Sequence, residues 1–386
     1  MTSMPTLDLK AFWADNDKAL ADPWSKSNPH VPMRHGLGYH TMFAELGLPY
    51  EMNRLDVDCD YEFARRGAKA YNQKAKEIIG VEVCNEEQYN PARRFPRIRG
   101  VGELFECQRV WQSESWWLLE AAHTPAELSA LLDRTDRLDI RAAMFPDDWE
   151  PRCAQLLEQW GARPGLGKSI RGPVTLATSI YGSENLIYLI LDEPQLAARF
   201  RDTIQRVALE YYAICDEVSD PAQRQPCFRL NDDNCALLTP EMYEFFALPI
   251  VTALFERFAP APGDVRYQHS DSDMAHIMPL LRRAGLNACN FGPNLRVAQI
   301  RAALPNAVIH GQLAPFTLMN NDADAITAEA QRDCGEAGIG GGLVLCSAGS
   351  VNDGTRLTSI RAVMHAVQQH AEWQGPPVVP TRCPAV

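Results

Sequence analysis

Residues 227–249 read CFRLNDDNCALLTPEMYEFFALP, and this stretch shows the repeating unit that decides the fold. It begins with Cys227–Leu230, a β-rich run that predicts a short buried strand. After a polar loop, Thr239 takes the N-cap position before a helix predicted over 240–258, whose first residue is proline. A further strand is predicted at 265–269. The stretch therefore predicts one strand–helix unit of a parallel sheet.

The same alternation extends outward from this unit, over roughly residues 165 to 370. A first strand is followed by five strand–helix pairs, which fit either a doubly wound open sheet or a closed barrel. No GxGxxG turn follows any predicted strand, and this disfavours a dinucleotide-binding sheet. The strands are predicted at Ser169–Thr178, Cys227–Leu230, Val265–His269, Ala288–Phe291, Val308–Gly311 and Leu343–Cys346, and the helices at Glu184–Cys215, Pro240–Phe258, Met274–Ala284, Val297–Leu304, Ala323–Ala337 and Leu357–Gln369.

The first 150 residues are less regular than the rest. A helix is predicted at Tyr61–Ile79, a strand at Val81–Cys84, and two helices within Thr124–Gln159. Between them lies a cluster of arginines and aromatic residues that either binds an anionic substrate or forms a salt-bridged surface. The tryptophans that follow form an aromatic wall, part of the core, or a subunit contact. The cluster consists of Arg93, Arg94, Phe95, Arg97, Arg99, Phe105, Arg109 and Trp111, and the tryptophans are Trp111, Trp116 and Trp117.

The overall composition narrows the class of protein. The net charge of −12 repels nucleic acids and anionic membranes, so neither is an expected partner. No window reaches the ~18 apolar residues that a membrane span requires, and no basic start precedes an apolar run. The 11 cysteines show neither a CxxC pair nor a framework of disulfide spacings. We therefore expect a cytoplasmic protein that acts on a small molecule, with most cysteines buried as small apolar residues.

Polar residues stand at the carboxyl ends of the predicted strands, where parallel βα folds bind their ligands. His269 and Asp271 are two residues apart at the end of an extended strand, so their side chains share one side. They form either part of a metal site or an acid–base pair in which the carboxylate orients the imidazole. The other strand ends supply Asp232, Asp233, Asn290, His310, Gln312 and Cys346.

Four strand-end residues, including Arg171 after the first strand, have roles that the sequence alone leaves open. Asp232 and Asp233 act as a general base, hold a cation, or bond to the backbone of their own turn. Arg171 anchors a carboxylate or forms a structural salt bridge. Cys346 either supplies a thiolate to a metal or packs in the core.

Several stretches resemble the uroporphyrinogen decarboxylase superfamily. Leu230–Asp233 followed by 238–249 is similar to that superfamily's strand, aspartate and S/T-P-E-x-Y-x-x-F-x-x-P helix. His310–Pro315 is similar to a later strand end, and Gly341–Ser350 to the last barrel strand. The resemblance implies an α/β fold with a single (β/α)8 TIM-type barrel and an N-terminal helical extension. The expected division is an extension or cap at 1–80, the barrel at 81–375 and a tail at 376–386.

The resemblance also has departures that bear on function. Decarboxylases of the superfamily carry an arginine-rich P-x-W-x-M-R-Q-A-G-R motif, whereas Val31–His40 reads VPMRHGLGYH and keeps one arginine, Arg34. The zinc-dependent methyltransferases use H-x-C and a later cysteine, whereas this chain has His269 with Asp271, and Ser350 in place of the cysteine. Oxygen ligands from a carboxylate and a hydroxyl are chemically harder than thiolates. A metal held by them is less suited to activating a thiol acceptor.

We therefore expect a methyl or alkyl transferase, or an O-demethylase, acting on a small organic substrate. The resemblance implies a corrinoid protein, tetrahydrofolate or a thiol as methyl acceptor, and zinc or another divalent metal held by His269, Asp271 and Cys346. A homodimer is a further expectation. Asp232 and Asp233 join His269 and Asp271 as catalytic candidates, and the expected substrate-binding residues are Arg34, His35, Arg171, Asn290, His310 and Gln312.

Two alternatives remain open at this stage. The first is a metal-free decarboxylase without a cofactor, in which Arg171 and Arg34 anchor a carboxylic acid and Asp232 or Asp233 stabilises a developing cation. The second is a barrel that binds a small ligand without catalysis, against which the strand-end histidine and aspartates argue.

Overall fold

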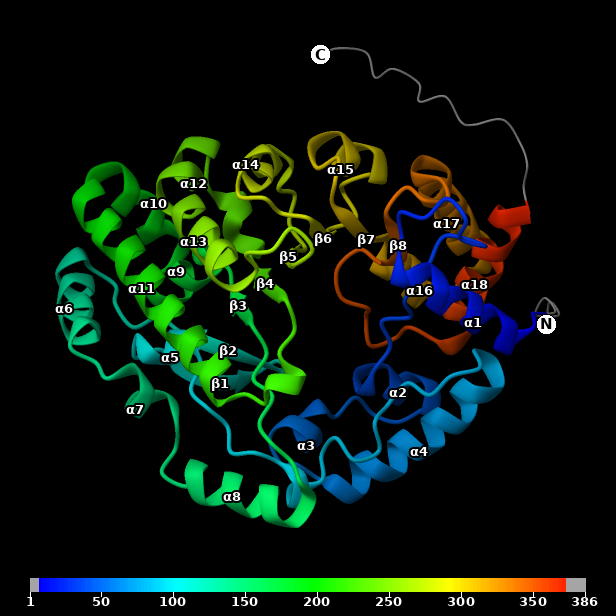
Figure 1. The fold of residues 1–386 in the computed structure, drawn as a ribbon, viewed down its shortest axis with the longest axis horizontal. Helices are drawn as coiled ribbons and strands as arrows, with labels where there is room; N and C mark the ends of the chain where they lie inside the picture. Colours follow the sequence, from blue (N-terminus) through cyan, green and yellow to red (C-terminus); the bar gives the residue numbers. More distant parts are fainter. Residues whose placement is uncertain (1–6, 373–386) are drawn as a thin grey trace. The chain divides into compact units, whose positions relative to one another are not determined.

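The computed structural model describes residues 7–372, which form an α/β protein (Figure 1). The chain divides into two compact units. The central unit is Asn90–Asn287, and the terminal unit joins the residues up to Tyr89 with those from Ala288 onward. The predicted tail at 376–386 lies outside the described residues, and the predicted domain boundaries stay predictions.

The central unit contains three parallel strands in chain order: β3 (Ser169–Arg171), β4 (Cys227–Asn231) and β5 (Val265–Ser270). Side chains alternate along them, so that Leu230 is buried while the next residue, Asn231, is exposed. The strands therefore have one buried face and one accessible polar face. The helices of this unit are α5 (Val101–Leu104), α6 (Pro125–Asp136), α7 (Ile140–Met144), α8 (Trp149–Trp160), α9 (Pro173–Tyr181), α10 (Ser183–Asp192), α11 (Pro194–Val218), α12 (Pro240–Phe246), α13 (Leu248–Phe258) and α14 (Met278–Arg283), with short 3-10 turns η1 (Pro91–Arg93), η2 (Pro221–Gln223), η3 (Asp233–Leu237) and η4 (Ala275–Ile277).

The terminal unit contains three more parallel strands: β6 (Ala288–Phe291), β7 (Val308–Leu313) and β8 (Leu343–Ser347). Met33 forms a parallel bridge to Leu345 of β8. The side-chain amide of the buried Asn16 holds Met33 by two hydrogen bonds, at 2.8 and 3.1 Å. The helices of this unit are α1 (Leu9–Ala21), α2 (Tyr39–Leu46), α3 (Met52–Asp56), α4 (Tyr61–Ile78), α15 (Val297–Ala303), α16 (Pro315–Asn320), α17 (Ala323–Ala337) and α18 (Leu357–Glu372).

The predicted α/β class is confirmed, and residues 7–372 supply six of the expected parallel strands, three in each unit. The predicted strand at Val81–Cys84 was wrong. The buried side-chain amide of Asn72 accepts hydrogen bonds from the backbone amides of Val83 and Cys84 and donates to the carbonyl of Cys84. With these backbone groups already satisfied, the segment needs no neighbouring strand.

Four predicted elements of the central unit have other bounds. The helix predicted over 240–258 is two helices, α12 and α13, and the helix predicted over Met274–Ala284 is the 3-10 turn η4 followed by α14. The strand at Ser169–Thr178 ends at Arg171, because Pro173 begins helix α9. The helix predicted over Glu184–Cys215 is two helices, α10 and α11. Pro194 separates them because proline lacks the amide that would continue the first helix, and it fits the first position of the second.

No single helix within residues 7–372 is long and apolar enough to cross a membrane, although α9 and α10 pass that test as a pair bent by 101°.

A β-hairpin in the arginine-rich region was not predicted. Strands β1 (Gln108–Gln112) and β2 (Ser115–Leu119) pair antiparallel, with Trp111 opposite Trp116. The two turn residues between them both have positive φ angles, 50° and 57°, as the tightest hairpin turns require. The hairpin presents Arg109 on its first strand and two tryptophans on its second.

Gly172 is predicted to tolerate no side chain. A Cβ at this position would lie 2.2 Å from the Cβ of Asp232, which is fully buried. We expect Gly172→Ala to lower the free energy of unfolding by about 1–3 kcal/mol, as overpacking of a core does. Urea unfolding measures this, with Gly167→Ala as the matched control, because nothing lies within 4 Å of a Cβ there. Equal stability of the two variants would contradict the prediction.

Candidate functional site

A row of polar side chains crosses the three strands of the central unit. Arg171 at the end of β3 is in register with Asn231 of β4, which is in register with His269 of β5. Neighbouring strands lie about 4.8 Å apart, so Arg171 and His269 originate roughly 10 Å from each other. None of the three side chains is fully buried. The row therefore places a cation, an amide and an imidazole along one accessible edge.

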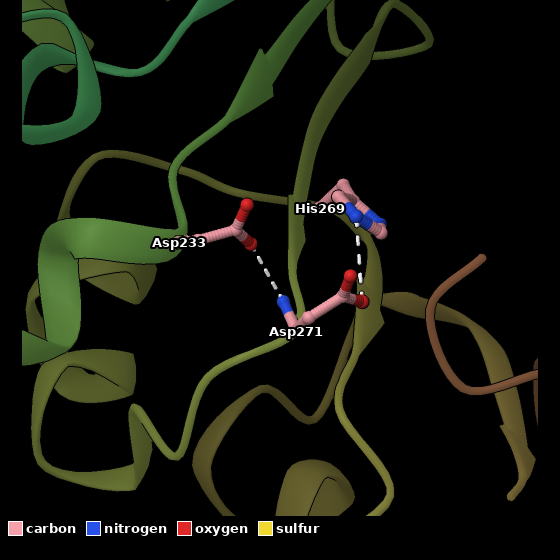
Figure 2. Close-up of side chains that lie close together, drawn as sticks. All are labelled: Asp233, His269 and Asp271. Carbon is pink, nitrogen blue, oxygen red and sulfur yellow. Dashed lines mark hydrogen bonds and ion pairs between the residues drawn. The ribbon is translucent and has the colours of Figure 1, made fainter. Parts of the chain in front are cut away.

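Asp233, His269 and Asp271 form a cluster at the carboxyl ends of β4 and β5, with His269 still inside β5 (Figure 2). One potential ligand atom from each lies within 4.8 Å of the others. His269 Nε2 is 3.5 Å from Asp271 Oδ1, and the backbone amide of Asp271 donates to Asp233 Oδ1 at 2.7 Å. Asp233 and His269 are half-buried, while the side chain of Asp271 is 52% exposed. The cluster is thus both ordered and open to a ligand.

The two consecutive aspartates after β4 have different surroundings. The carboxylate of Asp232 turns toward the start of helix α9, where it accepts a hydrogen bond from the backbone amide of Thr175 at 2.8 Å. The backbone amide of Asp232 donates to the carbonyl of His269 at 3.0 Å, which joins the ends of β4 and β5. Asp232 thereby caps a helix and holds the loop from which Asp233 reaches the cluster.

Burial raises the pKa of Asp232 from 3.8 to about 6, although its hydrogen bonds to α9 oppose the shift. Because the folded pKa lies above the unfolded one, the folded protein binds the extra proton between pH 4 and 6. The contribution of Asp232 to stability is therefore fully present below pH about 4 and is lost as the pH rises through about 6.

The Asp232→Asn variant is expected to lose this pH dependence. Relative to the variant, the wild-type protein should lose about 3 kcal/mol of unfolding free energy between pH 4 and pH 7, from about 1.4 kcal/mol for each unit of pKa shift. Urea unfolding of both proteins at the two pH values measures the difference. Parallel pH profiles would refute the prediction.

The donors of the cluster fit a divalent cation. Two carboxylates and one imidazole supply hard oxygen and borderline nitrogen ligands, and their charge of −2 with a neutral imidazole matches a divalent ion. Zinc and manganese accept this donor set, and magnesium or calcium would be held by the carboxylates. The cluster contains Asp233 in addition to the predicted ligands His269 and Asp271.

Arg171 extends toward the hairpin. Its Nη1 lies 3.5 Å from the hydroxyl of Ser179 on α9, and it lines a cavity together with Arg97 and Arg109. The arginine cluster seen in the sequence is therefore partly a set of salt bridges, as in Arg97 with Glu103, and partly the lining of a cavity. The sequence does not reveal that Arg171 lies beside this cluster, because Arg171 follows Arg109 by more than 60 residues.

In the terminal unit, Asn290 and Gln312 bind backbone groups at the strand ends. The Asn290 amide donates to the carbonyls of His310 and Ser347, which links β6, β7 and β8. Gln312 donates to two carbonyls of the loop between β6 and α15, while its buried Oε1 has no hydrogen-bond partner among residues 7–372. Both side chains hold loops in place, and substrate contact by Asn290, His310 and Gln312 stays a prediction.

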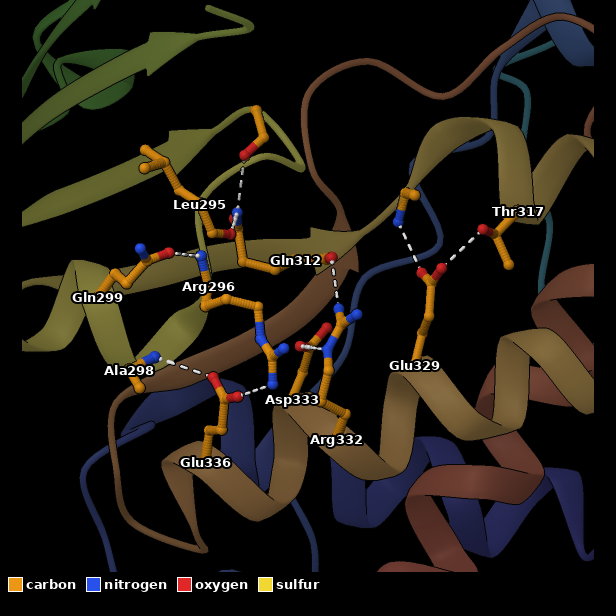
Figure 3. Close-up of polar contacts among 12 residues, drawn as sticks. Leu295, Arg296, Ala298, Gln299, Gln312, Thr317, Glu329, Arg332, Asp333 and Glu336 are labelled. Atoms are coloured by element: carbon orange, nitrogen blue, oxygen red, sulfur yellow. Dashed lines mark hydrogen bonds and ion pairs between the residues drawn. The ribbon is translucent and has the colours of Figure 1, made fainter. Parts of the chain in front are cut away.

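Helix α17 fixes the same strand ends through charged side chains (Figure 3). Arg332 donates to the carbonyl of Gln312 at 3.3 Å and pairs with Asp333, which is fully buried. Glu329 accepts from the amide of Ala314 at 2.9 Å. Burial raises the pKa of Asp333. These contacts hold the end of β7 against α17.

Arg34, His35 and Cys346 lie together at the end of β8. The backbone amide of Arg34 donates to the carbonyl of Leu345 at 3.0 Å, next to Cys346. Burial raises the pKa of the Cys346 thiol to about 12, although the charge of Arg34 opposes this. Burial also lowers the pKa of His35, and the charge of Arg34 adds to that shift. Cys346 is therefore a neutral thiol in this environment, and its role as a ligand stays a prediction.

The family model for uroporphyrinogen decarboxylase matches residues 153–370. Comparison with curated proteins found no match. Among solved structures, the chain is similar to a methyltransferase from Methanosarcina mazei, with 16% identity, a TM-score of 0.56, and 94% of this chain and 99% of that chain covered. A B12-independent methionine synthase from Shewanella sp. W3-18-1, in complex with selenomethionine, has 9% identity and a TM-score of 0.38, with 80% and 86% covered.

The family match confirms the resemblance on which the barrel prediction depends. The likeness to the methyltransferase, at 16% identity, shows a shared fold.

Proposed function

Because this chain belongs to the uroporphyrinogen decarboxylase family, we propose that it is a methyl or alkyl transferase whose site is the Asp233, His269 and Asp271 cluster. The observation that carries the proposal is the approach of two carboxylates and an imidazole to within 4.8 Å, at the carboxyl ends of two neighbouring strands. Such strand ends are where barrel enzymes place their chemistry. The similar fold of a methyltransferase supports the same reading.

The proposed reaction removes a methyl group from an oxygen or nitrogen of a small organic substrate. The acceptor attacks the methyl carbon, and the bond from that carbon to the heteroatom breaks with its electron pair going to the heteroatom. His269 delivers a proton to this atom as negative charge develops on it. Asp271, 3.5 Å from Nε2, stabilises the protonated imidazole before the transfer. Asp233 holds the Asp271 backbone in place.

The cluster is proposed to hold a divalent cation, with zinc as the first candidate. With the cation bound, His269 would be a neutral ligand, and the cation would act as the Lewis acid on the leaving heteroatom in place of the proton. Without the cation, His269 supplies the proton. The donor set contains no thiolate among Asp233, His269 and Asp271, so activation of a thiol acceptor is disfavoured. A corrinoid protein or tetrahydrofolate is the proposed acceptor, and a homodimer the proposed assembly.

The proposal is tested with the purified protein and methyl donors labelled in the methyl carbon. Methyl ethers and methylamines are offered with cob(I)alamin, tetrahydrofolate or a thiol, and the label is followed into the acceptor. Transfer that requires the protein supports the proposal. Loss of transfer after chelation, with recovery on adding zinc or manganese, supports the cation. Transfer that survives chelation, in protein shown to be metal-free, removes the cation and keeps the acid role of His269.

Decarboxylation of a small carboxylic acid is the second candidate, and the position of Arg171 beside Arg97 and Arg109 favours it. These arginines would anchor the acid, and Asp233 would stabilise a developing cation. Asp232 cannot stabilise that cation, because its carboxylate is buried against α9. Release of labelled carbon dioxide from carboxyl-labelled acids, without methyl transfer, would establish this candidate. Stabilisation by a ligand without any product would instead indicate a binding protein.

A further inference from the structure

A cavity of about 350 Å³ lies between the β1–β2 hairpin and the end of β3. This volume falls within the ~300–1,000 Å³ of small-molecule sites. A second cavity of about 190 Å³ shares Gly100, Leu118 and Arg171 with it, so the two adjoin. The charged and aromatic residues that line the larger cavity are Arg97, Glu103, Arg109, Trp116, Trp117 and Arg171.

The cavity carries a net positive charge. Arg97 and Glu103 cancel each other, because both guanidinium nitrogens donate to the carboxylate at 2.7 Å. The four charged lining residues are three arginines and one glutamate, which together carry a formal charge of +2. Arg171 has a neutral contact nearby, the hydroxyl of Ser179 at 3.5 Å. A guanidinium group binds a carboxylate through two parallel hydrogen bonds, so the cavity matches an organic acid.

The cavity also has an aromatic wall. The guanidinium carbon of Arg109 lies 3.6 Å from the centre of the Trp116 ring, which fixes the plane of its fork. The neighbouring Trp117 is 51% exposed, an unusual position for so large an apolar side chain. Its indole nitrogen donates to the carbonyl of Gln112 at 3.0 Å, which fixes its ring against the hairpin. Because successive residues of a strand point to opposite faces, Trp116 and not Trp117 shares the face of Arg109. A rigid indole beside a guanidinium favours a flat ring that carries a carboxylate.

We propose that the hairpin cavity binds the carboxylate of a planar aromatic acid, with Arg109 and Arg171 as its anion-binding residues and Trp116 as its aromatic surface. The proposal that the cavity binds an acid is argued from the contacts of the cavity alone and does not need the proposed function. That the acid is also the substrate depends on the proposed function. Arg171 begins the polar row that ends at His269, so it connects the cavity with the cluster along one strand edge.

Calorimetric titration of the full chain with benzoate, benzamide and acetate tests the site. Benzoate is expected to bind at least about tenfold more tightly than benzamide, which has the same shape without the charge, and than acetate, which has the charge without the ring. Arg109→Met is expected to raise the Kd for benzoate about tenfold or more. Trp116→Ala is expected to weaken the binding of benzoate more than that of acetate, because it removes the aromatic surface.

The matched control is Arg283→Met, which removes one exposed arginine of the same unit, paired with Glu244 outside the cavity. The Kd of this variant for benzoate should equal that of the unaltered protein. Equal binding of benzoate and benzamide, or equal effects of Arg109→Met and Arg283→Met, would overturn the proposal. Tryptophan emission that responds to protein concentration and not to benzoate would also overturn it, by identifying the hairpin as a subunit contact.

The two proposals fail separately. Benzoate binding that depends on Arg109, in a protein that transfers no methyl group from any donor, keeps the cavity and rejects the proposed function. Methyl transfer by a protein that binds benzoate no better than benzamide keeps the function and rejects the cavity.

Discussion

Replacing His269 by glutamine is expected to lower kcat for methyl transfer by about 10²–10⁴-fold, the usual contribution of a positioned acid or base. Glutamine has a similar reach and an amide that can hydrogen bond, but it cannot deliver a proton at neutral pH. KM should change less than kcat, because the proton is needed as the bond breaks. Steady-state rates of labelled methyl transfer, with the acceptor saturating, measure both constants.

His123→Gln is the matched control for this variant. His123 belongs to the same unit and also lies beside a carboxylate, Glu120 at 3.2 Å, but its side chain is 65% exposed and is not a member of the cluster. It should keep the activity of the unaltered protein. If His269→Gln and His123→Gln are equally active, His269 has no role in the reaction. Thermal unfolding of both variants shows whether each is folded.

Asp233→Asn and Asp271→Asn are each expected to weaken binding of zinc or manganese by about 100-fold or more. The residues that merely orient metal ligands contribute 10–100-fold to affinity, and a ligand itself contributes more. Each change keeps the size of the side chain and removes a negative charge from the cluster. Competition between the protein and a chromophoric chelator measures the affinity for the added metal.

Asp273→Asn is the control, because Asp273 is an exposed aspartate of the same loop that does not belong to the cluster. It should bind metal as the unaltered protein does. Equal loss in all three variants would mean that the loop attracts cations through its overall charge. A protein that binds neither metal above background would leave His269 as the acid without a cation.

The sequence predicted much of the order of elements in the second half of the chain. The strands at 227–230 and 288–291 agree closely with β4 and β6, because alternating short apolar runs and helical spacing are local signals. The helix that begins at Thr239 was also found, since its cap and the proline after it are encoded locally. The hairpin β1–β2 was missed, although the polar pair Ser113-Glu114 between two aromatic runs was a usable signal.

The candidate site, like the fold, was predicted by the sequence only in part. The i, i+2 spacing of His269 and Asp271 in an extended strand was enough to predict that their side chains meet, and they lie 3.5 Å apart. The choice between Asp232 and Asp233 was not readable from sequence. It depends on the amides at the start of α9, which attract the first carboxylate and leave the second to approach Asp271.

The sequence by itself determined the α/β class, the positions of most strands in the second half and the polar strand ends, because each of these follows from neighbours within a few residues. The tertiary structure alone decided which of those polar groups act together. It buried Asp232 against a helix more than 50 residues earlier, and it placed Arg171 beside Arg109 of the hairpin. Charges separated this far along the chain interact only when the backbone brings them close, since their interaction depends on distance in space.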